Sequence, residues 1–354
     1  MSSITTGAYL GNFGVALMLT VGQECCPVTE IDVGRLSEIR AATFTVNGEY
    51  IVGGGPGNGL GVWRVQDGKQ MAMLAAKDVH CVAVSQDGKR IAAGTDSGEV
   101  FVWNAEAFEQ VFFFRKEDIY CQITGVDFSP DSTRLVTTLW NGTTTVWDVA
   151  ARKKVRTLDH EGYVRAAKYS PQGDRIAIAT DKSVQVWDSD DGHLLVHIPV
   201  EVTPWYNTGL LWSNNHLFVV SYGRIKQFEA STGSAVSEWP VPDPFFTNVY
   251  PCIALPRHGK FIAHSAKDIL TVWDTSTQAQ LSLIKHTRSI RAIAFSPDDQ
   301  FLAIGANTKK IVIKDLRDVS PTSYSTVSIV YRGIIAYQNG STANPFWASV
   351  RHAD

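Results

Sequence analysis

The sequence predicts an all-β protein built from seven copies of one four-stranded antiparallel unit. The first observation is a tryptophan that returns at nearly constant spacing, each time at the end of an alternating apolar stretch. It stands at Trp63, Trp103, Trp147, Trp187 and Trp273, and Phe228 and Lys314 occupy the two remaining places of the series. The steps are 40, 44, 40, 41, 45 and 41 residues. A period in this range is typical of a supersecondary unit copied many times.

The second observation is a turn landmark that recurs in phase with the tryptophans. Clusters of Pro, Gly, Asn and Asp stand at 45–50, 85–90, 129–134, 170–175, 212–216, 255–260 and 296–301. These residue types supply the backbone geometry of tight turns. Two landmarks that stay in register throughout indicate one repeated unit.

The strands of each unit are expected around these turns. Apolar segments precede the turns, as at 39–44, 164–169 and 290–295, and short apolar segments follow them, as at 50–55, 90–95, 175–180 and 301–306. The Trp-ending stretch comes next, and a weaker segment such as 154–158 ends the unit. Alternating apolar residues bounded by turn residues are typical of short strands, so we expect four antiparallel strands in each unit.

Seven such units resemble the WD40 family of seven-bladed β-propellers. The resemblance covers roughly residues 28–316 and includes the Trp-Asp pairs that end in Asp148, Asp188 and Asp274. Ser-Pro-Asp turns at 129–131 and 296–298 add to it. The resemblance implies that the tryptophan ends the third strand of each blade and packs against the neighbouring blade.

The ring is expected to close through an N-terminal strand. The spacing between outer strands and turns in the inner units places a strand at about Thr29–Val33, which would complete the seventh blade and remove an exposed sheet edge. The rival strand would follow Lys314, where Pro321 is a poor central-strand residue. Residues 1–27 then form an N-terminal extension, residues 28–316 form the propeller, and residues 317–354 form a tail of unknown packing.

Composition narrows the class of function. The chain has 354 residues, of which 44% are hydrophobic, and a net charge of -3, which argues against general nucleic-acid or membrane binding. Five cysteines without metal-ligand spacing fit small buried residues in a reducing compartment. Residues 14–22 are apolar, but no Lys or Arg precedes them, so we expect no signal peptide. We expect no cofactor and no metal.

A catalytic site is the weaker interpretation. The resemblance implies a hydrogen-bonded pair of His160 and Asp181 in the fourth repeat, with Ile178 where the family has a hydroxyl residue. An Asp-oriented His is half of a catalytic triad, but no Ser or Cys nucleophile motif accompanies it, so the pair is interpreted as structural. The alternative function is a metal-dependent hydrolase or lactonase, for which the channel offers one ligand type, at His80.

Position-matched residues at the entry to each innermost strand give the candidate binding site. They are Arg40, His80, Thr124, Arg165, Thr208, Tyr250 and Arg291. In a closed propeller these positions ring the mouth of the central channel. Three arginines without a carboxylate favour an acidic or phosphorylated partner segment. The alternative is a solvated mouth, in which the arginines pair with local acids such as Glu38, Glu117 and Glu161.

The fifth and sixth repeats carry Pro-rich aromatic loops in place of short ones. Trp205, Tyr206, Phe245 and Phe246 either present aromatic contacts to a partner or fill inter-blade packing beside Phe228. The prediction is therefore a non-catalytic scaffold, a monomeric ring that binds another protein or peptide on its loop-rich face. The resemblance implies a cytoplasmic or nuclear location.

Overall fold

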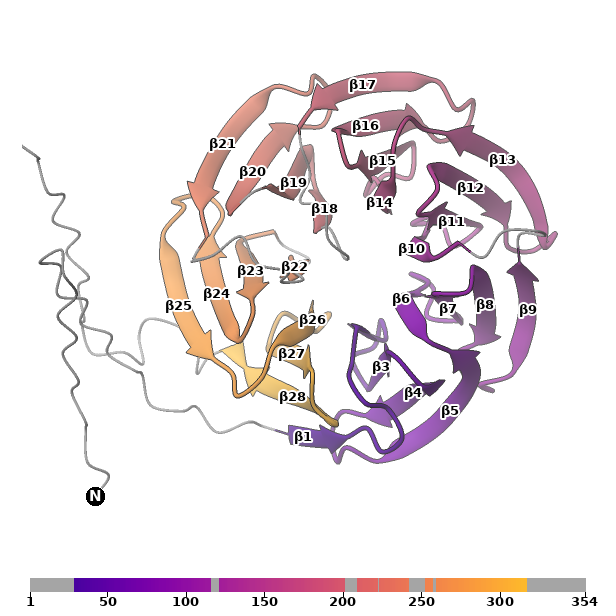
Figure 1. Ribbon diagram of the computed structural model, residues 1–354, viewed down its shortest axis with the longest axis vertical. Coiled ribbons are helices and arrows are strands. Elements are labelled where there is room, and N and C mark those ends of the chain that lie inside the picture. Colours follow the sequence, from indigo (N-terminus) through magenta and orange to yellow (C-terminus); the bar gives the residue numbers. More distant parts are fainter. Residues whose placement is uncertain are drawn as a thin grey trace, which may run out of the picture. The chain divides into compact units, whose positions relative to one another are not determined.

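The described residues form seven four-stranded antiparallel sheets (Figure 1). The computed structural model describes residues 29–115, 121–200, 209–221, 223–241, 252–256 and 259–316. Each sheet is one blade, and six of the seven blades take four consecutive strands of the chain in spatial order. The predicted all-β propeller of four-stranded units is confirmed. The expected extension and tail lie outside the described residues.

Blades 1 to 4 follow the predicted units. Their strands are β2 (Ala41–Phe44), β3 (Tyr50–Gly54), β4 (Asn58–Arg64) and β5 (Gln70–Lys77); β6 (Val79–Val84), β7 (Arg90–Thr95), β8 (Glu99–Asn104) and β9 (Gln110–Arg115); β10 (Ile123–Phe128), β11 (Arg134–Leu139), β12 (Thr143–Asp148) and β13 (Lys153–Asp159); β14 (Val164–Tyr169), β15 (Arg175–Thr180), β16 (Ser183–Asp188) and β17 (Leu194–Pro199).

Blades 5 to 7 complete the series. Their strands are β18 (Leu210–Ser213), β19 (His216–Ser221), β20 (Arg224–Glu229) and β21 (Ala235–Pro240); β22 (Cys252–Ala254), β23 (Phe261–Ala266), β24 (Ile269–Asp274) and β25 (Gln280–Lys285); β26 (Ile290–Phe295), β27 (Phe301–Ala306), β28 (Lys310–Asp315) and β1 (Thr29–Asp32).

The innermost strands close a ring. Each contacts the innermost strand of the next blade, from β2 through β6, β10, β14, β18 and β22 to β26, and β26 contacts β2. Figure 1 shows the blades arranged around a central axis in chain order. A closed ring leaves each blade with two neighbours, so both faces of every sheet are covered.

β1 closes the ring, as the sequence predicted. It pairs antiparallel with β28, from Thr29 opposite Ile313 to Asp32 opposite Lys310. Ile31 is fully buried against blade 1, and Lys310 forms an ion pair with Glu30 of β1. The ends of the propeller are thus held by main-chain hydrogen bonds between strands about 280 residues apart in the chain.

The turn landmarks work by one shared mechanism. In four blades a serine hydroxyl accepts the backbone N–H of the residue five positions later, at Ser85, Ser129, Ser170 and Ser296, over 2.8–3.0 Å. The turns also place one residue in the left-handed region, with φ between 50° and 82°, at Gly48, Gly88, Ser132, Gly173, Asn214, Gly259 and Asp299. Gly, Asn and Asp tolerate this conformation best, which explains their recurrence in the sequence.

The recurring tryptophans mark the seams between blades. Trp63 is fully buried among Ile31, Ile311 and Ile313 of blade 7, and Trp103 packs on blade 1. The ring of Trp147 stacks on Phe114 of blade 2 with centroids 3.7 Å apart. The expected inter-blade packing of the repeated tryptophan is therefore present, and it supplies much of the apolar burial that holds the ring together.

Candidate functional site

The two ends of the blades differ in the loops they carry. Because the strands of a blade alternate in direction, the turn between its second and third strands lies at the same end as the connection to the next blade. We call this end the mouth face; the turn at 96–98 and the connection at 160–163 belong to it. The hairpins between first and second strands and between third and fourth strands lie on the opposite face. The five candidate ring residues that the structure describes lie on the mouth face: Arg40, His80, Thr124, Arg165 and Arg291.

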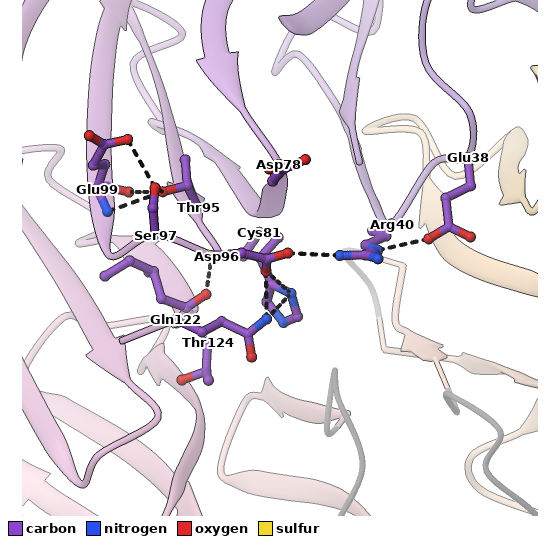
Figure 2. Close-up of polar contacts among 12 residues, drawn as sticks. Glu38, Arg40, Asp78, Cys81, Thr95, Asp96, Ser97, Glu99, Gln122 and Thr124 are labelled. Atoms are coloured by element: carbon purple, nitrogen blue, oxygen red, sulfur yellow. Dashed lines mark hydrogen bonds and ion pairs between the residues drawn. The ribbon is translucent and has the colours of Figure 1, made fainter. Parts of the chain in front are cut away.

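Arg40 lies between two carboxylates at the mouth. Its Nε donates to Glu38 Oε1 at 2.8 Å, and its Nη1 donates to Asp96 Oδ2 of blade 2 at 2.9 Å (Figure 2). Burial lowers the pKa of the Arg40 guanidinium, but Glu38 and Asp96 outweigh burial and hold that pKa above its ordinary value. Arg40 therefore links Glu38, on the segment between β1 and β2, to Asp96 of blade 2.

Asp96 joins the second and third blades to this network. Its Oδ1 accepts a hydrogen bond from Gln122 Nε2 at 2.5 Å and lies 3.4 Å from Nδ1 of the buried His80. Burial raises the pKa of Asp96, but the contacts with His80 and Gln122 and the charge of Arg40 outweigh it, so the pKa lies below its ordinary value. Asp96 is thus ionised at neutral pH and holds three partners.

Arg291 completes the network from blade 7. Its Nε lies 3.9 Å from Glu38 Oε2, so one carboxylate contacts two of the three predicted ring arginines. Two guanidinium groups and two carboxylates, Glu38 and Asp96, balance in charge here. This geometry matches the alternative in which local acids pair with the arginines. An anionic ligand at this sector would have to compete with Glu38.

The third ring arginine has a different environment. Arg165 of β14 is buried, and its guanidinium carbon lies 4.0 Å from the ring centroid of Trp140 and 5.7 Å from that of Tyr163. The rings of Trp140 and Tyr163 lie 5.2 Å apart at 34° to each other. Tyr163 remains 49% exposed. The Arg165 guanidinium thus lies within cation–π distance of both rings, and these contacts favour a fixed position of the Tyr163 ring.

Thr124 lies inside the mouth as a structural residue. It is buried, and its hydroxyl shares a hydrogen bond of 2.9 Å with the hydroxyl of Thr138 on the neighbouring strand. The remaining predicted residues, Thr208 and Tyr250 of the ring and Trp205, Tyr206, Phe245 and Phe246 of the aromatic loops, lie outside the described residues.

The structure corrects the expected pairing of His160 with Asp181. His160 Nδ1 lies 2.9 Å from Gln185 Oε1, its Nε2 lies 3.0 Å from Thr144 Oγ1 of blade 3, and Asp181 Oδ1 accepts the backbone N–H of Tyr163. Trp187 Nε1 donates to the same Gln185 oxygen. With Ile178 in the hydroxyl position, the longer Gln185 side chain reaches the histidine instead.

His160 therefore serves as a link between blades. Burial lowers its pKa despite the Gln185 contact, so the imidazole is neutral at pH 7. Among the described residues, no group of three His, Cys, Asp or Glu side chains is placed to hold a metal ion. The same part of the chain contains no helix long and apolar enough to span a bilayer.

Sequence reasoning missed three residues of this site: Asp96, Gln122 and Trp140. Asp96 and Gln122 lie on the loops that follow β7 and precede β10, where nothing in the sequence separates a network member from a solvated residue. Trp140 did carry a usable signal. It stands seven residues before Trp147 and so falls outside the repeat period, which indicates a role other than seam packing.

The Glu38 network makes a first prediction. Replacing Glu38 with Gln removes the charge shared by Arg40 and Arg291. We expect the free energy of unfolding to fall by about 1–2 kcal/mol, the lower part of the range for hydrogen bonds to charged groups, because Arg40 remains partly exposed. Urea unfolding measures the change. Glu161→Gln, on the exposed connection before Tyr163, is the matched control and should shift stability by less than about 0.5 kcal/mol. Equal effects of the two substitutions would remove Glu38 from the network.

Comparison with known proteins agrees with this architecture. The family model described as WD domain, G-beta repeat matches residues 68–104, 115–148, 152–188 and 278–313. Protein groucho of Drosophila melanogaster is 21% identical over 330 residues, covering 89% of this chain and 38% of that protein. Small ribosomal subunit protein RACK1z of Oryza sativa subsp. japonica is 27% identical over 96 residues, covering 26% of this chain and 29% of that protein. The matches thus span about a third of these relatives.

Solved structures show the same fold. The structure of U3-55K superposes with a TM-score of 0.73 at 17% identity, covering 83% of this chain and 100% of that one. The crystal structure of the RRP9 WD40 repeats gives a TM-score of 0.72 at 17% identity, covering 83% and 99%. The match to WD40 repeats supports a protein-interaction scaffold as the class of function. The chain therefore contains WD40 repeats in the matched residues and folds as a seven-bladed β-propeller.

Proposed function

We propose that this propeller is a non-catalytic scaffold that binds another protein, or a peptide segment of one, on its mouth face. The observation that carries the proposal is the cluster of Tyr163, Trp140 and Arg165, which we call the aromatic anchor. Tyrosine, tryptophan and arginine are the residue types that dominate binding energy at protein interfaces. The half-exposed Tyr163 ring offers the contact surface, and the buried side of the cluster fixes it.

The aromatic anchor is already held in place before a partner arrives. Asp181 accepts a hydrogen bond from the backbone N–H of Tyr163 at 2.9 Å, and the Tyr163 ring packs at a tilt against Trp140, with the Arg165 guanidinium near both rings. A side chain fixed in this way loses little conformational entropy on binding. Binding through a fixed aromatic side chain uses no reacting group, and the proposed partner is another protein or a peptide segment of one. We place this scaffold in the cytoplasm or nucleus, as a monomeric ring.

Tyr163→Ala is expected to reduce partner capture roughly tenfold or more, the effect of losing a central interface residue. Proteins captured from an extract of the source cells would be quantified by mass spectrometry. Val236→Ala is the matched control, because Val236 is 51% exposed on the outer strand β21. Tyr163→Phe keeps the ring against Trp140 and should retain capture. Unchanged capture by Tyr163→Ala, or an equal loss in both alanine variants, would contradict the proposal.

The chemistry of the partner segment is a second question at the same face. An acidic or phosphorylated segment would have to replace Glu38 at Arg40 and Arg291, and a phosphate can do so through bidentate hydrogen bonds. Glu38→Gln removes the carboxylate that both arginines share and leaves Asp96 on Arg40, so the variant should bind a phosphoserine peptide several-fold more tightly than the natural protein. A fluorescence anisotropy titration of both proteins decides this. Equal affinities would exclude an anion at this sector.

A further inference from the structure

A groove lies on the opposite face, at the seam where the ring closes. It has a volume of about 690 Å³, within the usual range for ligand pockets. Blade 1 contributes the turn residues 48–50, the segment 64–66 and Met71, and blade 7 contributes Phe301 and Ile313 with Thr29 of β1. The groove is thus separate from the mouth face and from the proposed partner site.

Five of the ten residues that line this closure groove carry apolar or aromatic side chains. Tyr50, Val65, Met71, Phe301 and Ile313 line it, with Met71 38% exposed and Ile313 fully buried. Glu49 and Arg64 also line the groove: Glu49 accepts a hydrogen bond from Asn47 Nδ2 at 2.7 Å, and Arg64 lies 3.5 Å from Asp67, so both charges have partners. Apolar surface that is open to water is costly, and burying it against another apolar segment is favourable by about 25 cal/mol per Å². The groove therefore fits an uncharged apolar peptide segment.

The chain itself supplies such a segment next to the groove. Residues 14–22, with sequence GVALMLTVG, carry no charge, and six residues separate them from Thr29, which lines the groove. Six residues span at most about 20 Å when extended, so the segment is confined close to the seam. We propose that residues 14–22 dock in the closure groove and that this contact reinforces the closure of blade 7 on blade 1.

Because the linker to Thr29 is short, even weak contacts suffice to keep residues 14–22 in the groove. A segment joined by a short linker has an effective concentration in the millimolar range, so even a dissociation constant of about 100 μM keeps the site about nine-tenths occupied. A free peptide must then compete with the tethered copy. Its apparent affinity for the natural chain should be about tenfold weaker than for a chain whose own segment cannot dock.

A peptide titration tests this on the full chain. The probe is a fluorescein-labelled synthetic peptide of residues 12–24, and the protein is the full chain with Leu17→Asp and Leu19→Asp, which place charges in the tethered segment. We expect the peptide to bind this double variant about tenfold more tightly than the natural chain. Equal affinity for the two proteins, or binding to neither, would overturn the proposal.

Two further variants locate the contact. Met71→Glu, added to the double variant, should abolish peptide binding because Met71 lines the groove. Val236→Glu, on blade 5, is the control: Val236 is also exposed, and this substitution should leave peptide binding unchanged. Binding that survives Met71→Glu would place the segment elsewhere. Sedimentation velocity tests whether a second copy of the chain occupies the groove instead. A concentration-dependent dimer of the natural chain that is absent in the double variant would assign the groove to a second copy and overturn the intramolecular contact.

Discussion

Replacing Trp63 with alanine is expected to lower the free energy of unfolding by about 3–5 kcal/mol, the cost of removing a large buried aromatic side chain. Trp63 is fully buried at the seam between blades 7 and 1, where it packs with Ile31, Ile311 and Ile313. The seam joins the first and last blades, so a cavity here weakens the closure of the ring as well as the local core. Urea unfolding followed by circular dichroism measures the loss.

Two control substitutions show whether the loss of stability comes from the seam contact of Trp63 or would follow from removing any large apolar side chain. Trp63→Phe keeps most of the apolar contact and should cost much less than the alanine substitution. Leu283→Ala removes a side chain that is 45% exposed on the outer strand β25, and should cost less than about 1 kcal/mol. A Trp63→Ala cost as small as that of Leu283→Ala would mean that the tryptophan seams do not hold the ring.

Acid is expected to destabilise the propeller through His264 of blade 6. This side chain is fully buried, and burial lowers its pKa to about 3. The unfolded chain binds a proton on this histidine below about pH 6.5, whereas the folded chain does not until about pH 3. The stability contributed by the neutral imidazole is therefore complete above pH 6.5, and it falls by about 1.4 kcal/mol per pH unit down to pH 3.

His264→Gln isolates this effect, because glutamine is neutral at every pH. The free energy of unfolding, measured between pH 7 and pH 4, should fall more steeply in the natural protein than in the variant, by about one proton's slope. The variant loses stability at neutral pH, but the comparison of slopes is independent of that offset. Parallel pH profiles for the two proteins would show that His264 titrates normally in the fold.

The repeated part of the fold was predictable because its determinants are local. Turn residues and strand alternation act over a few positions, so the strands and their order followed from the landmarks at Ser85, Ser129, Ser170 and Ser296. The closing strand was expected at Thr29–Val33 and is described at Thr29–Asp32. Its position followed from a spacing rule that depends on the neighbouring blades being alike.

The candidate site was less predictable because its partners come from different blades. Arg40 and Asp96 are 56 positions apart, and no local pattern shows that they meet. The sequence showed three arginines in matching positions, but the structure gives two of them a shared carboxylate and the third an aromatic cover. His160 differs, because its partner Gln185 belongs to the blade that His160 precedes and takes the place of a hydroxyl that Ile178 cannot provide.

Lysine-directed cross-linking of the captured complex tests the central claim, partner binding on the mouth face, most directly. Exposed lysines lie on both faces: Lys182, Lys267 and Lys309 are on mouth-face turns, whereas Lys69, Lys89 and Lys260 are on hairpins of the opposite face. We expect cross-links to the partner from the mouth-face set, with the strongest from Lys182, which follows Asp181, the residue that contacts Tyr163. Cross-links confined to the opposite set would contradict the claim.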